Sequence, residues 1–81
     1  MDDITLDAVI EMLSGIRDDV DFATATGLVD DRVLDSFDIL SVISAIDEEF
    51  DVAVPAKDIV PDNFNSAEGI YHMVRGLADA E

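Results

Sequence analysis

The chain has 81 residues, so we expect a single domain, residues 1–81, with a thin hydrophobic core. Twenty Asp and Glu residues face four Lys and Arg residues, which gives a formal net charge of −16. This balance excludes nucleic-acid binding, which needs Lys and Arg against phosphate, and it disfavours contact with anionic membranes. Because 49% of the residues are hydrophobic and interleaved with the charges, the chain is not a disordered acidic tail.

Cysteine is absent, which excludes disulfides and thiolate metal sites. The longest apolar runs are too short to span a bilayer, so we expect no insertion into a membrane. The acidic start, Met1-Asp2-Asp3, disfavours a signal or transit peptide. We therefore expect a cytoplasmic monomer whose negative field attracts basic protein partners.

The first half of the chain contains a predicted helix and then a long loop. Residues 6–16 carry apolar side chains at helical spacing, with Thr5 as a candidate N-cap and Asp7 where the helix dipole favours negative charge. Residues 18–35 lose this periodicity but keep many apolar residues, so this loop should lie across the domain and pin it. Its apolar residues are Phe22, Leu28, Val29, Val33 and Leu34.

The second half begins with the strongest predicted helix, residues 36–50, which Asp35 can cap. Its inner face consists of Ile39, Val42, Ile43, Ile46 and Phe50. Pro55 can open a short helix that continues through Ile59 and that Pro61 ends. A last helix is predicted over residues 66–78, capped by Asn65 or Ser66. The fold class is therefore all-α, a small up-and-down four-helix bundle of three main helices plus a short third helix.

Few residues can support catalysis. The single histidine, His72, is interpreted as a surface or boundary residue, and the Asp clusters lack the ligand pattern of an EF-hand, so no metal site is predicted. The remaining candidate is Asp35-Ser36-Phe37-Asp38, where the loop meets the second predicted helix. Taken alone, this tetrapeptide favours an ordinary helix cap.

Three segments in register resemble the acyl carrier protein family. Asp35-Ser36-Phe37-Asp38 is close to the family's Asp-Ser-Leu-Asp, and Ala45-Ile46-Asp47-Glu48-Glu49-Phe50-Asp51 resembles the acidic end of its second helix. Val54-Pro55 is similar to the Ile/Val-Pro step into the family's short third helix. The spacing between these segments agrees without gaps, and the resemblance covers nearly all of the chain.

The resemblance implies that Ser36 carries a 4′-phosphopantetheine arm, transferred from coenzyme A by a phosphopantetheinyl transferase. The chain would then be a carrier without turnover of its own, serving an acyl- or aminoacyl-loading ligase and synthase or transferase enzymes with basic docking patches. The family docks through its second helix. The candidate docking residues are Asp35, Phe37, Asp38, Leu40, Ser41, Ser44, Asp47, Glu48, Val54 and Asp58. The Phe37 ring could pack inward or be an exposed anchor for partners.

The type of cargo stays open. Ser41 and Ser44 stand where many fatty-acid carriers have Glu and Met, which disfavours a role in primary fatty-acid synthesis. Residues 34–37 and 62–66 resemble D-alanine carriers of teichoic-acid modification and stand-alone carriers of secondary metabolism, although Asp38 stands where D-alanine carriers often have Gly. The cargo could be an acyl chain, an amino acid or a polyketide intermediate. The competing hypotheses are a non-covalent acidic helical adaptor and, more weakly, a calcium-responsive helical protein.

The charge imbalance predicts a salt-dependent fold. Repulsion among the carboxylates opposes the compact state, and added ions screen it, so the melting temperature should rise as NaCl increases from about 10 mM to 500 mM. Thermal denaturation followed by circular dichroism measures this. A melting temperature that does not change with ionic strength would contradict the prediction.

Overall fold

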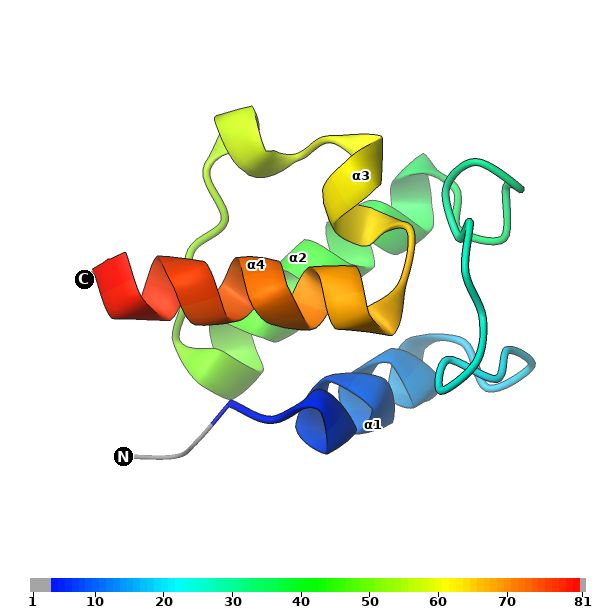
Figure 1. Cartoon of the computed structure of the whole chain (residues 1–81), viewed down its shortest axis with the longest axis horizontal. Helices are drawn as coiled ribbons and strands as arrows, with labels where there is room; N and C mark the ends of the chain where they lie inside the picture. The colour runs from blue at the N-terminus through cyan, green and yellow to red at the C-terminus, as the bar shows by residue number, and fades with distance from the viewer. Residues whose placement is uncertain (1–3, 81) are drawn as a thin grey trace.

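A computed structural model describes residues 4–80, and its element order is shown in Figure 1. The elements are α1 (Leu6–Ile16), α2 (Ser36–Phe50), the 3-10 helix η1 (Ala56–Asp58), α3 (Pro61–Phe64) and α4 (Ala67–Ala80). The described residues contain no strand, so the predicted all-α bundle is confirmed. The acidic start of the chain, residues 1–3, lies outside the described range.

The helices α1 and α2 begin and end where their sequence patterns predict. The Thr5 hydroxyl accepts a hydrogen bond from the Ala8 N–H at 3.1 Å, which satisfies one of the free donors at the start of α1. Asp35 caps α2 in the same way through the Asp38 N–H. The predicted inner face of α2 is confirmed, with Val42 and Ile46 fully buried and the remaining members half-buried against the core.

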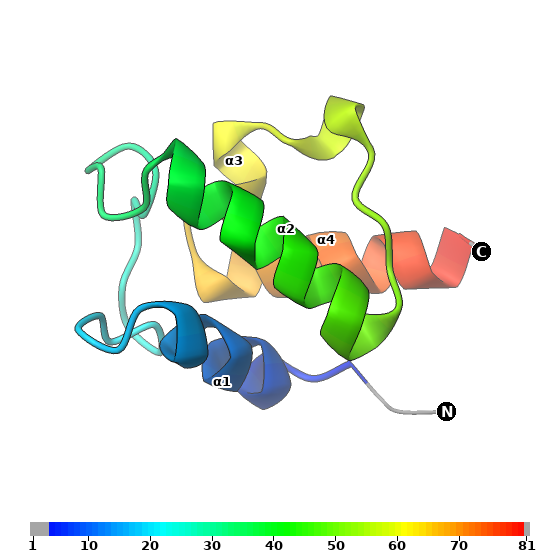
Figure 2. The same cartoon turned by 180° about the vertical axis from the view of Figure 1, so that it is seen from behind.

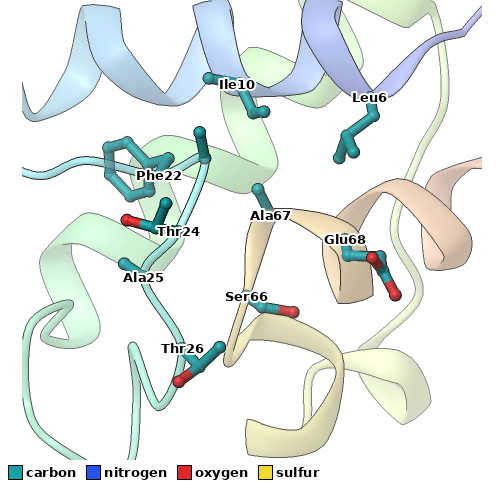
Figure 3. A pocket seen from close by; sticks show the side chains of 10 residues that line it. Leu6, Ile10, Phe22, Thr24, Ala25, Thr26, Ser66, Ala67 and Glu68 are labelled. Atoms are coloured by element: carbon teal, nitrogen blue, oxygen red, sulfur yellow. The ribbon is translucent and has the colours of Figure 1, made fainter.

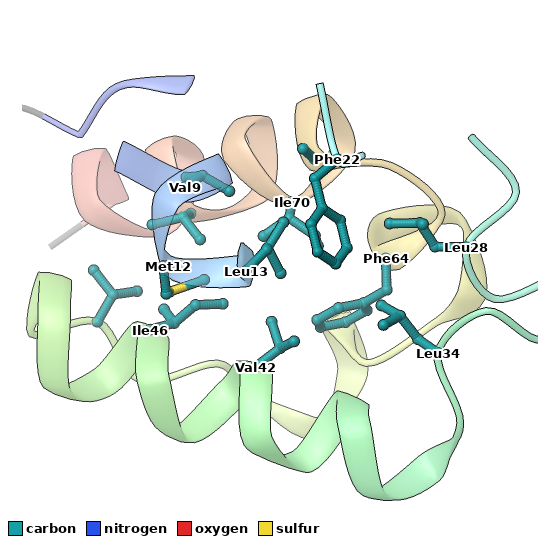
Figure 4. Packing of buried hydrophobic residues seen from close by; sticks show 13 residues of the cluster. Val9, Met12, Leu13, Phe22, Leu28, Leu34, Val42, Ile46, Phe64 and Ile70 are labelled. Atoms are coloured by element: carbon teal, nitrogen blue, oxygen red, sulfur yellow. The ribbon is translucent and has the colours of Figure 1, made fainter. Parts of the chain in front are cut away.

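The core is one apolar cluster to which every α-helix and both long connections contribute (Figure 4). No polar side chain is buried within the described residues. Such a core is stabilised by removal of apolar surface from water, at roughly 25 cal/mol per Å². The buried members are Val9, Met12, Leu13, Phe22, Leu28, Leu34, Val42, Ile46, Val52, Phe64, Ala67, Ile70 and Val74.

The long loop between α1 and α2 lies across one end of the bundle, as predicted. Phe22, Leu28 and Leu34 are at most 3% exposed, so the loop is anchored at three points along its length. Asn65, at the junction of α3 and α4, adds a polar anchor: its Oδ1 accepts from the Val29 and Asp30 N–H groups at 2.9 and 3.0 Å. The Asn65 carbonyl also accepts from the Leu28 N–H at 2.8 Å.

The connection after α2 contains one more helical turn than predicted, while the cap of the last helix is one of the two predicted residues. The predicted short helix is the 3-10 turn η1, which ends at Asp58 before Pro61 is reached. Pro61 instead begins a second turn, α3, where its missing N–H costs nothing at the first helical position. The cap of the last helix is Ser66, whose hydroxyl accepts from the Gly69 N–H at 3.0 Å. Asn65 is instead engaged with the long loop.

The direction of the last helix also corrects the up-and-down prediction. Figures 1 and 2 show α1 running opposite to both α2 and α4, while α2 and α4 run in the same general sense and cross each other. The segment 51–66 returns the chain to the end at which α2 began, so α4 does not reverse the direction of α2. In both views the described chain starts and ends on one side of the molecule, and α2 starts on the opposite side.

Across residues 4–80, no helix combines the length and the apolar character that a membrane crossing requires.

The end of α2 generates a stability prediction. Asp51 adopts the left-handed conformation, φ 56° and ψ 41°, which disfavours any residue with a Cβ. We expect Asp51→Gly to raise the free energy of unfolding by about 0.5–1 kcal/mol. Asp51→Ala is the matched control, because it removes the same charge but keeps the Cβ, and it should be about 1 kcal/mol less stable than the Gly variant. Urea denaturation measures both, and equal stability of the two variants would contradict the prediction.

Candidate functional site

Ser36 is the first residue of α2, and its side chain is exposed to solvent. Two residues earlier, Leu34 is 3% exposed, and its N–H donates to the Leu28 carbonyl at 2.8 Å. The chain therefore emerges from the core at Leu34, turns at Asp35 and presents the Ser36 hydroxyl at the helix end. The hydroxyl is accessible, yet the backbone that carries it is fixed on both sides.

A reciprocal capping box closes the first turn of α2. Asp35 Oδ1 accepts from the Asp38 N–H at 2.9 Å, and Asp38 Oδ2 accepts from the Asp35 N–H at 3.3 Å. The N–H groups of Ser36 and Phe37 belong to the same turn and have no intrahelical partner, as at any helix start. The predicted cap at Asp35 is confirmed, and the box shows that a helix cap and an exposed Ser36 coexist in one motif.

Arg17 joins this turn from the end of α1. Its Nη1 donates to Asp38 Oδ2 at 2.8 Å and to the Val33 carbonyl at 3.1 Å, while Nε and Nη2 donate to the Asp19 carboxylate. Hydrogen bonds to Asp19 and Asp38 hold the pKa of the Arg17 guanidinium above its usual range, and the hydrogen bond from Arg17 lowers the pKa of Asp19. This contact could not be predicted from the sequence, because no local pattern links residues 21 positions apart.

Helix α2 lies at the front of Figure 2. Most of the predicted docking residues are exposed and recur along α2 at intervals of three or four residues, which places them on one stripe. Its first turns are apolar: Phe37 is 81% exposed and Leu40 is 63% exposed. The stripe continues through exposed polar and acidic residues, which are Ser41, Ser44, Asp47 and Glu48. The sequence left open whether Phe37 packs inward or points outward, and the structure shows that it points outward.

Of the remaining predicted docking residues, Asp35 is exposed, with one carboxylate oxygen engaged in the capping box, and the other three are less accessible. The side chain of Asp38 is 17% exposed and ion-paired with Arg17, so it belongs to the helix cap more than to a free surface. Val54 and Asp58 are half-buried near η1. The sequence analysis missed Ile59 and Val60, which are 41% and 42% exposed, because a short apolar pair in an irregular segment has no periodicity to indicate its orientation.

A small open pocket lies elsewhere on the molecule (Figure 3). It has a volume of about 180 Å³ and is lined by α1, by loop residues 22–26 and by the start of α4, with no residue from α2. Figure 3 shows Leu6, Ile10 and Phe22 around its apolar side and Thr24, Ser66 and Glu68 around its polar side. The pocket is therefore separate from the Ser36 site.

The residues around Ser36 suit a covalently attached phosphate better than a metal ion. Within residues 4–80 there is no group of three or more His, Cys, Asp or Glu side chains arranged to hold a metal. An exposed hydroxyl at the start of a 15-residue helix lies where free N–H groups and the helix dipole favour a phosphodiester. Asp35 and Asp38 oppose this effect, and Arg17 offsets the charge of Asp38. The site thus fits a phosphate-linked group.

Comparison with known proteins identifies the family to which the chain belongs. No protein-family model and no solved structure matches the chain. A curated relative, aminoacyl carrier protein 1 of Bradyrhizobium diazoefficiens, is 30% identical over 69 residues, which cover 82% of this chain and 77% of the relative. The chain therefore belongs to the carrier-protein family.

Proposed function

We propose that this protein carries a thioester-linked acyl or aminoacyl intermediate on a 4′-phosphopantetheine arm attached to Ser36. The observation that carries the proposal is the exposed Ser36 hydroxyl at the start of α2, held between buried Leu34 and the Asp35–Asp38 capping box. Membership of the carrier-protein family supports it.

The arm supplies a thiol, which this chain lacks because it contains no Cys. The chain's own residues hold the attachment point. Ser36 Oγ provides the ester oxygen, and the Ser36 and Phe37 N–H groups with the helix dipole favour the phosphodiester. The Ser36 Oγ–phosphorus bond forms as the pyrophosphate bond of coenzyme A breaks, and adenosine 3′,5′-bisphosphate leaves. We infer no general base within the chain, so the transferase must accept the hydroxyl proton. The protein then acts as a tether that raises the effective concentration of its cargo at a partner enzyme.

For the cargo, we favour an aminoacyl group over a fatty acyl or polyketide group. The relative's printed name describes an aminoacyl carrier. The exposed centre of the α2 face carries Ser41 and Ser44, so it is polar, unlike the faces of many fatty-acid carriers. D-alanine for teichoic-acid modification is one version of this cargo. The intact mass of protein isolated from its native host would identify the group.

We propose that partners dock on the outer face of α2. They would include the phosphopantetheinyl transferase, a loading ligase and an acceptor enzyme, each with a basic patch. Exposed Phe37 and Leu40 offer apolar anchor points beside Ser36, and Asp47 and Glu48 offer charge farther along the helix. Apolar contacts of this kind supply affinity, while the charges speed and orient the encounter.

Ser36→Ala tests the attachment site. On incubation with coenzyme A and a broad-specificity phosphopantetheinyl transferase, the wild-type chain should gain the mass of one arm, and Ser36→Ala should gain none. Ser14→Ala is the matched control, because Ser14 is an exposed serine of helix α1, outside the α2 face, and it should be modified like the wild type. Intact-mass spectrometry gives the result, and circular dichroism checks that every variant keeps its helices.

A wild-type chain that stays unmodified, or a Ser36→Ala chain that is modified, would overturn the proposal. The adaptor hypothesis predicts partner binding that survives Ser36→Ala without any transfer of the arm.

Phe37→Ala tests the docking face. Because the ring is 81% exposed, its removal should leave the melting temperature within about 1 °C of the wild type. Loss of a buried aromatic contact in the complex should raise the transferase KM about tenfold, which corresponds to about 1.4 kcal/mol. Phe37→Leu is the control, since it keeps an apolar anchor and should retain most of the affinity. A transferase KM unchanged in Phe37→Ala would show that the ring is not an anchor.

A further inference from the structure

Arg17 links the end of α1 to both sides of Ser36. Its backbone N–H donates to the Leu13 carbonyl at 2.9 Å, so the residue is fixed as the C-cap of α1. Its side chain is 33% exposed and extends to the start of α2. There Nη1 bonds to the carbonyl of Val33, ahead of Ser36, and to the carboxylate of Asp38, beyond Ser36.

These contacts continue into the capping box. The Asp38 Oδ2 atom that accepts from Arg17 at 2.8 Å also accepts from the Asp35 N–H at 3.3 Å. The guanidinium therefore restrains the orientation of Asp38, and through Asp38 the turn that carries Ser36. Charge-assisted hydrogen bonds are stronger and more directional than neutral ones, which makes Arg17 an effective clamp on this turn.

The same residue changes the charge beside the hydroxyl. Asp35 and Asp38 place two carboxylates at the helix end where a phosphodiester would be attached, and like charges at short range repel. Of the ion pairs among the described residues, Arg17–Asp38 is the one that reaches α2. Without Arg17, the charge of Asp38 would oppose the favourable effect of the helix dipole.

We propose that Arg17 is a positioning residue for attachment of the arm at Ser36. It holds residues 33 and 38 around the hydroxyl and offsets the negative charge that a phosphate group meets there. This inference rests on the proposed function, since it concerns the same hydroxyl.

The test uses full-length, unmodified chains with coenzyme A and a broad-specificity transferase, at a temperature where each variant keeps its helical circular dichroism. Arg17→Met should lower kcat/KM of arm transfer about tenfold, largely through kcat, because the geometry of the turn changes more than the docking face does. Arg17→Lys keeps the charge but not the forked contacts, so its kcat/KM should lie between those of the wild type and Arg17→Met. Asp19→Asn is the matched control, since Asp19 contacts Arg17 but not α2, and it should stay within twofold of the wild type.

Two further measurements separate positioning from a general loss of stability. The double variant Arg17→Met/Asp38→Asn should recover part of the rate, because the unbalanced charge has gone, whereas a purely structural role predicts a further decrease. In the unmodified protein, hydrogen exchange of the Asp38 and Ile39 amides should be faster in Arg17→Met, while exchange of the Ile46 amide in the core should not change.

A folded Arg17→Met chain with wild-type transfer kinetics and wild-type exchange would overturn the inference. If Arg17→Met does not fold, a wild-type rate and exchange in Arg17→Lys would overturn it instead. If the wild-type chain itself takes no arm, the proposed function fails and the positioning role fails with it, and the exchange measurement then reports only whether Arg17 restrains the turn.

Discussion

The arrangement at the start of α2 depends on one constraint: an exposed serine must be attached to a backbone that does not move freely. The chain meets this constraint by burying Leu34 directly before the turn and by closing the turn with the Asp35–Asp38 capping box. The loop that leads to Leu34 is itself fixed by Phe22, Leu28 and the hydrogen bonds of Asn65. The backbone of Ser36 is therefore restrained while its hydroxyl faces solvent, which suits attachment of a long flexible group.

The strong negative charge has different roles in different places. On the outer face of α2, Asp47 and Glu48 are exposed and free to meet a basic partner. At the first turn of the same helix, Asp38 is nearly covered and ion-paired, so its charge organises the backbone instead. The exposed apolar side chains of Phe37, in the same first turn, and Leu40, in the next turn, complete the outer face. One helix thus combines the proposed attachment point, an exposed apolar surface and an acidic end.

Much of the fold followed from the sequence because its main signals are local. Helical periodicity and the caps Thr5 and Asp35 gave the correct bounds of α1 and α2. The helix α3 was missed because four residues are too few to show a period, and Pro61 is equally suited to ending one turn and beginning another. The direction of α4 could not be predicted either, since it depends on how an irregular connection packs.

The candidate site was predictable to a similar extent. Ser36 was found from a motif and a resemblance, and its exposure agrees with the role expected of it. The contact between Arg17 and Asp38 joins two distant parts of the chain, and only the packing of α1 against α2 brings them together. The outward orientation of Phe37 was also undecided in the sequence, because a first-turn aromatic can face either way.

The two ends of the described chain lie where they determine how the domain can be joined to other groups. The described chain starts and ends on one side of a molecule about 32 Å long, and α2 starts on the opposite side (Figures 1 and 2). A neighbouring domain, an affinity tag or a surface linkage would therefore meet the described chain, at residues 4 and 80, on the side away from the start of α2. The fold can therefore be built into a larger polypeptide, or immobilised, while its hydroxyl still faces open solvent.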